Sequence, residues 1–375
     1  MADEDHMRRA LALAAEGLGR TSPNPAVGCV IVSGGMVVGE GTTEPPGGPH
    51  AEVVALRQAG ERARGATAYT TLEPCDHTGR TGPCSVALTR AGVAEVVYAL
   101  ADPHEAASGG ARRLAAAGVR VRGGVLADEA RALVRPWLHG LGGSPLPWVT
   151  AKLACSLDGR TATRTGDSKW ITGPAARARG HDLRQASDAV LVGVGTVLAD
   201  DPGLDPRPEG RVPAPGLKVV LDTRLRTPPD ARLLRTPGPA LIACAEGADQ
   251  GRADALRAAG AEVTAFPAER SVDLGAVLLS LRERGCLSVM IEGGGRVLGS
   301  AFDTGLVDEV WAFVAPLIVG GGQPAVDGEG PARIADAYRL HAMRTEALGP
   351  DILFRGLTAP EETEAAGEPA CSLAS

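Results

Sequence analysis

Four residues in the first quarter of the chain combine types and spacing that suit a catalytic zinc site. His50 and Glu52 stand one residue apart in PHAEVVAL, and Cys75 and Cys84 end the two halves of TLEPCDHTGRTGPC. One imidazole and two thiolates fill three corners of a zinc tetrahedron and leave the fourth for water, as in catalytic rather than structural sites. Zinc lowers the pKa of such a water to about 7, so hydroxide is available at neutral pH.

Glu52 is the acid that this arrangement needs. In a hydrolytic deamination, hydroxide attacks the amino-bearing carbon of a ring, and a carboxylate that is not a ligand moves the proton to the departing ammonia. Pro74 and the helix predicted after Cys84 favour thiolates at the two cysteines. A single histidine at a helix start, or two loop cysteines alone, would more often be structural. The conjunction of these residues predicts a catalytic zinc ion with Glu52 as the proton shuttle.

Spacing and charge separate the candidate substrates. Eight residues lie between Cys75 and Cys84, whereas nucleoside and nucleic-acid deaminases typically carry PCxxC. The formal net charge is −7 and the lysines and arginines are scattered, which excludes the basic patch that a nucleic-acid partner requires. We therefore predict a small-molecule substrate. Two alternatives stay open: a nucleoside or nucleic-acid deaminase with an extra domain, and a non-catalytic ligand-binding protein with a structural zinc.

Glycine-rich turns mark a second candidate site. VMIEGGGRVLGSAF is a buried-strand pattern that runs into a glycine turn and a helix, and DAVLVGVGTVLADDP supplies a second strand and turn. Backbone N–H groups in such turns approach phosphates closely, and turns that follow neighbouring strands meet at one sheet edge. The glycines do not form GxGxxG, so a Rossmann fingerprint is not predicted, and a purely structural turn is the alternative.

The elements that must position these residues begin with an α/β sandwich built on one sheet. Helical spacing runs from Met7 to Leu18, and CVIV and MVVGEG read as a strand pair across the turn at residues 33–35. A helix is predicted over 50–63, followed by a strand over 66–72 and alternating helices and strands to residue 123. The Gly- and Pro-rich residues 140–147 are predicted to be a linker.

A second α/β unit is predicted from Trp148. It opens with WVTAKLACSLDGRTAT, in which Asp158 and Gly159 suit a hairpin turn. Arg177, His181 and Arg184 fall on one face of a predicted helix, which by itself indicates a solvated basic face. Further strands are predicted at residues 188–194, 217–222, 240–245, 261–266, 287–294 and 309–316. The polar tail, 358–375, is predicted to be disordered.

Length and composition set the class of protein. The chain has 375 residues, which is too long for one ordinary hydrophobic core, so we predict two domains. The seven cysteines are an odd number, and the sequence predicts no secretory signal. We therefore do not expect structural disulfides. No apolar run reaches the length of a membrane span. We expect a cytoplasmic protein without a membrane partner that forms a homo-oligomer.

On these motifs the chain resembles the bifunctional riboflavin-biosynthesis deaminase/reductase family. The shared motifs cover almost the whole chain before its tail: SPNPAVGCVIV, PHAEV, TLEPCDHTGRTGPC, KLACSLDGRTA, SKWITG, VGVGTVLADDP and IEGGGRVLGSAF. The resemblance implies a zinc-dependent deaminase domain over residues 1–143, with a cytidine-deaminase-like α/β/α sandwich. It also implies an NADPH-dependent reductase domain over residues 148–357, with a dihydrofolate-reductase-like α/β fold.

The implied reactions are consecutive. The first domain would remove an amino group from a phosphorylated diaminopyrimidinone riboside, and the second would use NADPH to reduce the ribosyl group to ribityl. A related two-domain enzyme that acts on a modified pyrimidine in a side pathway is the alternative.

The resemblance also implies site residues. Zinc would be held by His50, Cys75 and Cys84, with Glu52 as the catalytic residue. The pyrimidine of the first reaction would contact Asn24, His77 and Arg80. NADPH would contact Ala154, Trp170, Thr196, Asp200, Thr223, Gly294, Gly295, Arg296, Val297, Leu298, Gly299 and Ser300. The substrate of the second reaction would contact Lys152, Ser168, Arg184, Leu204, Arg207 and Glu292.

Several of these residues have simpler readings. Asn24 between two prolines suits a turn, and Arg80 and Lys152 suit solvated surface charges. The chain also departs from the family where Thr43 replaces a common histidine, where residues 102–105 read DPHE rather than DPNP, and where GRTPPC has become GRTGPC. We expect these changes to alter substrate contacts and to leave the metal ligands and Glu52 intact.

Overall fold

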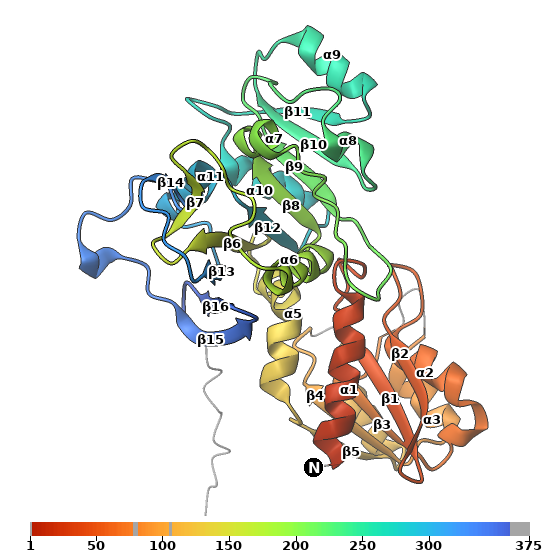
Figure 1. Ribbon diagram of the computed structural model, residues 1–375. Helices are drawn as coiled ribbons and strands as arrows, with labels where there is room; N and C mark the ends of the chain where they lie inside the picture. The colour runs from red at the N-terminus through yellow and green to blue at the C-terminus, as the bar shows by residue number, and fades with distance from the viewer. Residues whose placement is uncertain (1, 78–81, 105–106, 361–375) are drawn as a thin grey trace, which may run out of the picture.

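Two large β-sheets divide the described chain, one in each half of the sequence, and a small two-stranded sheet accompanies the second (Figure 1). The computed structural model describes residues 2–77, 82–104 and 107–360. The fold is mixed α/β, as predicted from the sequence. Residue 80 and residues 361–375, where a substrate contact and most of the disordered tail were predicted, lie outside the described residues.

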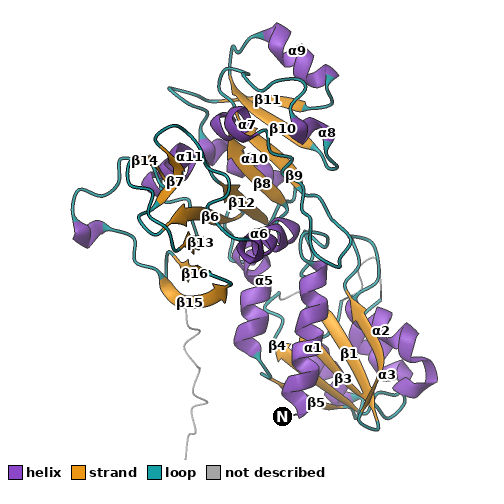
Figure 2. Ribbon diagram, in the orientation of Figure 1, coloured by secondary structure: helices purple, strands orange, loops and turns teal. Residues whose placement is uncertain are grey.

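The first sheet has the strand order β2-β1-β3-β4-β5, with β1 and β2 forming the antiparallel pair expected across residues 33–35. Its strands are β1 (Gly28–Ser33), β2 (Met36–Thr42), β3 (Thr67–Leu72), β4 (Glu95–Leu100) and β5 (Arg120–Gly123). Helices α1 (Ala2–Gly17) and α5 (Ala127–Leu141) lie along one face and contact each other (Figure 2). Helices on the opposite face are α2 (Ala51–Ala59), extended by η1 (Gly60–Ala63), α3 (Cys84–Ala91) and α4 (Gly110–Ala116).

Two glycines explain how closely these layers pack. A Cβ atom at Gly28 would lie 1.9 Å from the carbonyl oxygen of Ala10, so α1 rests directly on the backbone of β1. A Cβ atom at Gly41 would lie 2.3 Å from the carbonyl oxygen of Ala51, so the first turn of α2 rests on β2 in the same way. Because His50 immediately precedes that turn, the packing of α2 fixes the position of the histidine.

The second sheet has the order β11-β10-β9-β8-β12-β6-β13-β16-β15. All neighbouring pairs from β11 through β13 run parallel, and β16 and β15 add an antiparallel edge. Its strands are β6 (Trp148–Ser156), β8 (Ala189–Gly193), β9 (Leu217–Leu221), β10 (Ala240–Ala245), β11 (Glu262–Phe266), β12 (Ser288–Glu292), β13 (Glu309–Ala315), β15 (His341–Leu348) and β16 (Asp351–Leu357).

Helices connect the parallel strands, as this kind of sheet requires. They are α6 (Pro174–Ala186), α7 (Val194–Asp200), α8 (Arg232–Arg235), α9 (Gln250–Ala258), α10 (Leu274–Glu283) and α11 (Gly295–Asp303), with a short η2 (Ile334–Asp336) before β15. Because β6, β8, β9 and β12 are parallel, the loops that follow them lie at one edge of the sheet.

The hairpin predicted at Asp158 and Gly159 is wrong. The turn forms, but β6 pairs with β12 and β13, while β7 (Arg160–Thr163) pairs with β14 (Gly322–Pro324) in a separate two-stranded sheet. The Asp158 carboxylate accepts the backbone N–H groups of Val319 and Gly320, and so holds the turn against that distant segment. Long-range parallel pairing of β6 therefore overrides the local preference for a hairpin.

Helix α5 was not predicted, and it reaches into the expected linker. It contains Pro136, although proline is normally disfavoured in helix interiors, and it ends at Leu141. The face of α5 that carries Arg135 and His139 contacts Trp148, at the start of the second sheet. The His139 and Trp148 rings lie edge to face with their centroids 5.4 Å apart, and the Arg135 guanidinium lies 5.8 Å from the Trp148 ring centroid. The strands β15 and β16 were also not predicted.

Two candidate active sites

The three predicted zinc ligands converge in the first unit. His50 caps α2, Cys75 follows β3, and Cys84 begins α3, so three elements bring them together. The His50 Nδ1 lies 3.5 Å from the Cys75 Sγ and 3.3 Å from the Cys84 Sγ, and one ligand atom of each residue lies within 4.8 Å of the others. Two sulfurs and one imidazole nitrogen at this separation fit a tetrahedral zinc ion with one open position.

Electrostatics at the cysteines favour a bound cation. The Cys84 thiol donates a hydrogen bond that, with His50 and the Cys84 backbone N–H, lowers the pKa of Cys75 to about 4. The same partnership, together with burial, raises the pKa of Cys84. The first thiolate therefore forms readily, and a divalent cation between the sulfurs would favour the second as well.

Glu52 lies in the first turn of α2 and is only 4% exposed. Burial, followed by the charge of Cys75, raises the pKa of its carboxyl group. Glu52 and His50 both line a cavity of about 310 Å³. The predicted ring contacts Asn24 and His77 line the same cavity, as does Cys75. Cys84 is fully buried and does not line the cavity, but its sulfur lies beside His50, so the structure brings together every described residue predicted for this site.

Other acidic groups tie the loops of this cavity together. The Glu73 carboxylate accepts the backbone N–H of Ala111 at 2.9 Å, at the start of α4, and that of Asp102 at 3.3 Å. Asp76 accepts the Ser85 hydroxyl at 2.6 Å, which joins the first part of the cysteine loop to α3. These carboxylates hold the segments on which the ligands stand.

Two of the three places where the chain departs from the family, Thr43 and the DPHE segment, line this cavity, whereas Gly82 in the third does not. The Thr43 hydroxyl lies 3.2 Å from the backbone nitrogen of Val27, which donates to it, so its polar group is already engaged. His104, in the DPHE segment, donates its backbone N–H to Asp102 and lines the cavity as well. Both changes therefore fall where a substrate would be contacted.

Trp137 and Leu141 of α5 complete the wall of the cavity, and sequence reasoning missed them. Trp137 also packs against the core of the first unit. The amphipathic pattern of Val134, Trp137 and Leu141 at helical spacing was the available signal.

A second cavity, of about 650 Å³, opens at the carboxyl edge of β6 and β12 and is covered by α6. Ten of the residues predicted to bind NADPH or the second substrate line it: Lys152, Ala154, Ser168, Trp170, Arg184, Thr196, Asp200, Leu204, Arg207 and Glu292. Within it the Ser168 hydroxyl lies 3.5 Å from Asp200.

A buried ion-pair cluster forms one wall of this cavity. The Arg184 guanidinium donates to both carboxylate oxygens of Glu292, at 2.6 and 2.9 Å, and Lys152 donates to the same carboxylate at 3.2 Å. Burial opposes ionisation of Glu292, but these two cations outweigh it and hold its pKa well below the usual range. Arg184 and Lys152 are therefore committed to Glu292, and Lys152 is not the surface charge that was the alternative.

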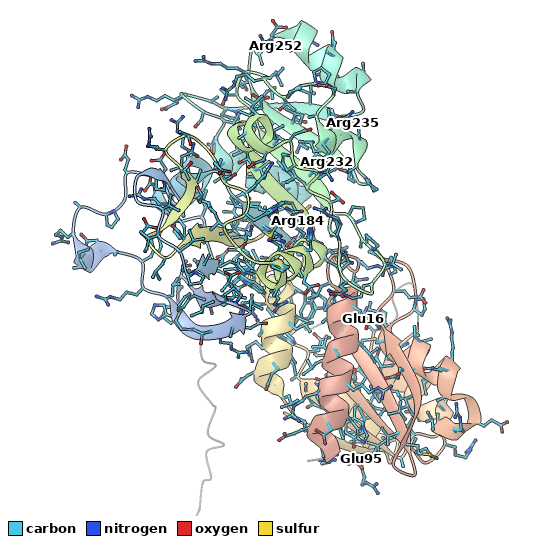
Figure 3. The ribbon with its side chains drawn as sticks, viewed as in Figure 1. Glu16, Glu95, Arg184, Arg232, Arg235 and Arg252 are labelled. Carbon is cyan, nitrogen blue, oxygen red and sulfur yellow. The ribbon has the colours of Figure 1, made fainter. Side chains whose placement is uncertain are left out.

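Arg207 differs from these cations. Its nearest carboxylate oxygen belongs to Asp205 and lies 3.8 Å away, and its side chain is 57% exposed. Figure 3 shows Arg184 among the side chains between α6 and the sheet, whereas Arg235 and Arg252 lie on α8 and α9 at the outer end of the second unit. Arg207 is therefore a cation at the cavity that keeps donors available for an anion.

The two glycine-bearing turns meet beside the cavity. A Cβ atom at Gly294 would lie 3.3 Å from the Thr196 hydroxyl oxygen, and Gly294 adopts a φ of +80° that favours glycine. The N-terminus of α11 begins at the next residue, so backbone N–H groups face this edge. This cradle fits the phosphate groups of a dinucleotide.

The remaining predicted cofactor residues do not line the cavity. Gly295 and Gly299 are required by packing, since a Cβ atom at either would lie within 2.7 Å of residues 324–328. Arg296, Val297, Leu298 and Ser300 lie on α11 with them. Thr223 follows β9, and its hydroxyl accepts the backbone N–H of Val272 at 3.2 Å.

Two further observations concern the described part of the chain. The cysteines within it form no disulfide. None of its helices combines the length and the apolar character needed to cross a lipid bilayer.

Comparison with known proteins identifies both halves. The family model described as the cytidine and deoxycytidylate deaminase zinc-binding region matches residues 1–100, and the model of the RibD C-terminal domain matches residues 147–354. The riboflavin biosynthesis protein RibD of Mycobacterium tuberculosis is 44% identical over 340 residues, which cover 90% of this chain and 91% of that protein. RibD of Escherichia coli is 39% identical over 367 residues, covering 94% and 98%.

Solved structures agree over nearly the whole length. The chain is similar to RibD of Acinetobacter baumannii at 38% identity, with a TM-score of 0.79 over 95% of this chain and 98% of that one. A diaminohydroxyphosphoribosylaminopyrimidine deaminase/5-amino-6-(5-phosphoribosylamino)uracil reductase of Thermotoga maritima is 31% identical, with a TM-score of 0.81 over 94% and 98%.

Proposed function

The chain belongs to the RibD family of riboflavin biosynthesis proteins, and from this membership we propose which residues carry out its two reactions. It is a bifunctional enzyme of riboflavin biosynthesis, with a zinc-dependent deaminase in its first half and an NADPH-dependent reductase in its second. The observation that carries the proposed site is the convergence of His50, Cys75 and Cys84 beside the buried carboxyl group of Glu52.

In the deaminase, His50, Cys75 and Cys84 hold the metal, and Glu52 handles protons. When bound, zinc supplies a water of lowered pKa to attack the ring. Glu52 would take one proton from the attacking water and deliver it to the amino nitrogen, which would leave as ammonia. The ring carbon would gain a carbonyl oxygen, and the second hydrogen of the water would pass to the neighbouring ring nitrogen. Asn24 and His77 orient the ring within the cavity, and the apolar face of Trp137 closes it.

In the reductase, the cavity wall around Glu292 receives the ribosyl group. NADPH, when bound, supplies the hydride that converts ribosyl to ribityl. The α11 N-terminus and the turn at Gly294 hold the cofactor's phosphates, and Thr196 borders them. Lys152 and Glu292 keep fixed charges beside the sugar, which a buried, fully hydrogen-bonded pair does without reorganisation.

The phosphate of the substrate is bound by Arg207 together with the Ser168 hydroxyl. This narrows the expectation that Arg184 and Arg207 share the phosphate, because the Arg184 donors are engaged by Glu292 and by the carbonyl oxygen of Asp205. A planar guanidinium with available N–H groups is the better anchor for phosphate.

The protein also has a proposed setting. We place the domain boundaries at residues 1–143 and 148–357, on either side of the short link between α5 and β6. We place the enzyme in the cytoplasm as a homo-oligomer. The exposed edge strand β15 supports self-association, because an unpaired sheet edge can pair with another copy. Sedimentation analysis would test the oligomer.

A paired assay tests the two sites. Ammonia release and NADPH oxidation are followed on the phosphorylated pyrimidine, and on its deaminated product, with and without a chelator. Chelation should stop ammonia release and spare NADPH oxidation on the deaminated product. Arg207→Ala should have the opposite effect, sparing deamination and weakening reduction. Loss of both reactions in either arm would contradict the division into two sites.

A further inference from the structure

The imidazole of His181 is a cavity group that the proposed reactions do not use. His181 lies on α6 between Arg177 and Arg184, and all three line the second cavity from one face of the helix. A basic face of this kind would ordinarily be solvated, yet here it closes over a cavity, and His181 is half-buried in it.

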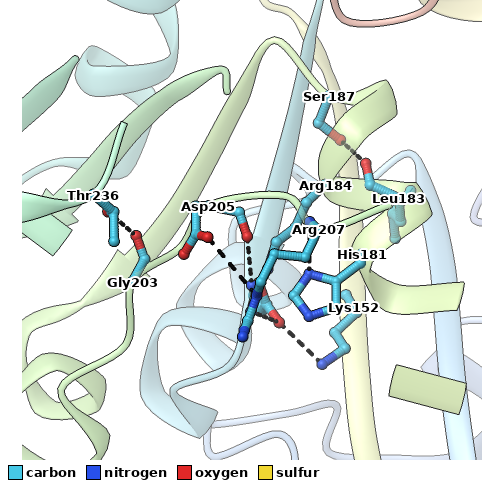
Figure 4. Close-up of polar contacts among 10 residues, drawn as sticks. Lys152, His181, Leu183, Arg184, Ser187, Gly203, Asp205, Arg207 and Thr236 are labelled. Carbon is cyan, nitrogen blue, oxygen red and sulfur yellow. Dashed lines mark hydrogen bonds and ion pairs between the residues drawn. The ribbon is translucent and has the colours of Figure 1, made fainter. Parts of the chain in front are cut away.

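The hydrogen bonding of the ring fixes its tautomer. The backbone N–H of Arg207 donates to the Nδ1 of His181 at 3.2 Å (Figure 4). A nitrogen that accepts carries no proton, so the proton of the neutral ring is on Nε2. His181 therefore serves as an acceptor for a backbone group twenty-six residues further along the chain.

The charges around the ring keep it neutral. The groups that face it are Arg184 on the same helix, Glu292 on β12, and Asp205 and Arg207 on the loop after α7. Burial, followed by the positive charges of Arg184 and Arg207, lowers the pKa of His181 to about 4. At neutral pH the ring is therefore an uncharged acceptor.

The segment that His181 contacts has little regular structure of its own. Residues 201–208 form no helix or strand, and Asp201 and Leu204 have φ values of 42° and 56°, in the left-handed region that side chains disfavour. The segment is held by individual contacts from elsewhere. The Thr236 hydroxyl donates to the carbonyl oxygen of Gly203 at 2.7 Å, and Arg184 donates to that of Asp205 at 3.2 Å.

We propose that His181 is a positioning residue of the reductase, whose Nδ1 holds the backbone of Arg207 so that the guanidinium meets the substrate phosphate. The inference rests on the proposed function, because it assigns that phosphate to Arg207. Since Arg207 is the exposed cation of the cluster and its side chain lacks a close ion pair, its direction depends on its backbone. His181 thus contributes to substrate affinity without touching the reacting atoms.

Two substitutions separate this role from a general effect on structure. In asparagine the amide oxygen is bonded to Cγ, as Nδ1 is in histidine, so His181→Asn keeps an acceptor for the Arg207 N–H. In glutamine the amide lies one bond further out, at the distance of Nε2, so His181→Gln keeps a polar group in the cavity and loses the acceptor. The two variants differ by one methylene group.

The measurement is steady-state NADPH oxidation on the deaminated, phosphorylated substrate. His181→Gln should raise the KM for this substrate about tenfold, as expected for one lost hydrogen bond that orders a binding group, with kcat changed by less than about twofold. His181→Asn should stay within about twofold of the wild type. The KM for NADPH should be unchanged in both, and inhibition by inorganic phosphate should weaken only in His181→Gln.

Thermal unfolding and ammonia release show that each variant is folded, because the deaminase does not use His181. Equal KM values for wild type and both variants would overturn the inference. A loss in His181→Asn as large as that in His181→Gln would also overturn it. If the wild-type protein itself oxidises no NADPH, the proposed function fails first and the inference fails with it.

Discussion

Arg184 and Glu292 are joined by two hydrogen bonds through a planar, two-pronged contact, with donor–acceptor distances of 2.6 and 2.9 Å. Their side chains are 14% and 13% exposed, so the pair is shielded from water. Removing the partner of a buried carboxylate lowers the free energy of unfolding far more than removing the partner of an exposed one. Breaking this contact should therefore have a measurable effect on stability.

Arg184→Ala should therefore destabilise the second half of the protein. Glu292 would keep only Lys152, and the free energy of unfolding should fall by about 3 kcal/mol, the lower part of the range for breaking a buried ion pair. NADPH oxidation should be lost as the cavity wall rearranges. Urea unfolding followed by tryptophan fluorescence measures the change. The matched control is Arg207→Ala, whose exposed side chain should leave stability unaltered, and equal stabilities for the two variants would contradict the expectation.

Glu52→Gln should retain zinc and lose ammonia release. The amide fills the same space but cannot take up and return a proton, so kcat for deamination should fall at least about a hundredfold. Metal analysis of the purified variant checks that the ligands still bind, and NADPH oxidation on the deaminated substrate checks the other half. Full activity in this variant would instead favour a structural zinc in a ligand-binding protein.

Trp137→Ala should weaken binding of the pyrimidine in the first cavity. Removing the indole opens the wall supplied by α5, and the KM for deamination should rise about tenfold while zinc content stays the same. Trp137→Phe keeps an aromatic face and should remain close to wild type. Equal KM values for Trp137→Ala and Trp137→Phe would show that the indole packs in the core and does not contact the pyrimidine ring.

Acid should destabilise the reductase through His181. The pKa of this histidine is lowered to about 4 in the folded protein, below its value of about 6.5 in an unfolded chain. The unfolded state therefore binds a proton first, and stability present above about pH 6.5 is lost as the pH falls toward 4. His181→Asn cannot titrate, so the loss of unfolding free energy between pH 7 and pH 5 should be smaller in this variant. An identical pH dependence would show that other groups cause it.

The zinc site was predictable from the sequence because its residues come from short motifs. His50 and Glu52 share one helix start, and the two cysteines flank a single loop, so spacing alone limits where they can lie. Most strands of both sheets, though not β15 and β16, were recognisable for a similar reason, since buried runs such as those of β1 and β12 are continuous and apolar.

Features that depend on distant partners were not predictable. The contact of His181 with Arg207 forms only when an irregular loop folds back onto α6. The pairing of β6 with β12 and β13 displaced the expected hairpin for the same reason. Helix α5 was hidden by Pro136, and its position beside the zinc site follows from how the first sheet is covered rather than from a local motif.

That helix also limits where the enzyme can be divided. The deaminase family model ends at residue 100, so a fragment of that length would keep every zinc ligand and Glu52 but leave the cavity without Trp137 and Leu141. A cut made after α5 keeps the cavity intact but removes the contacts of His139 and Arg135 with the Trp148 ring. Each separately expressed half would therefore lack contacts that it makes in the full chain, which gives a physical reason for keeping the two catalytic sites on one polypeptide.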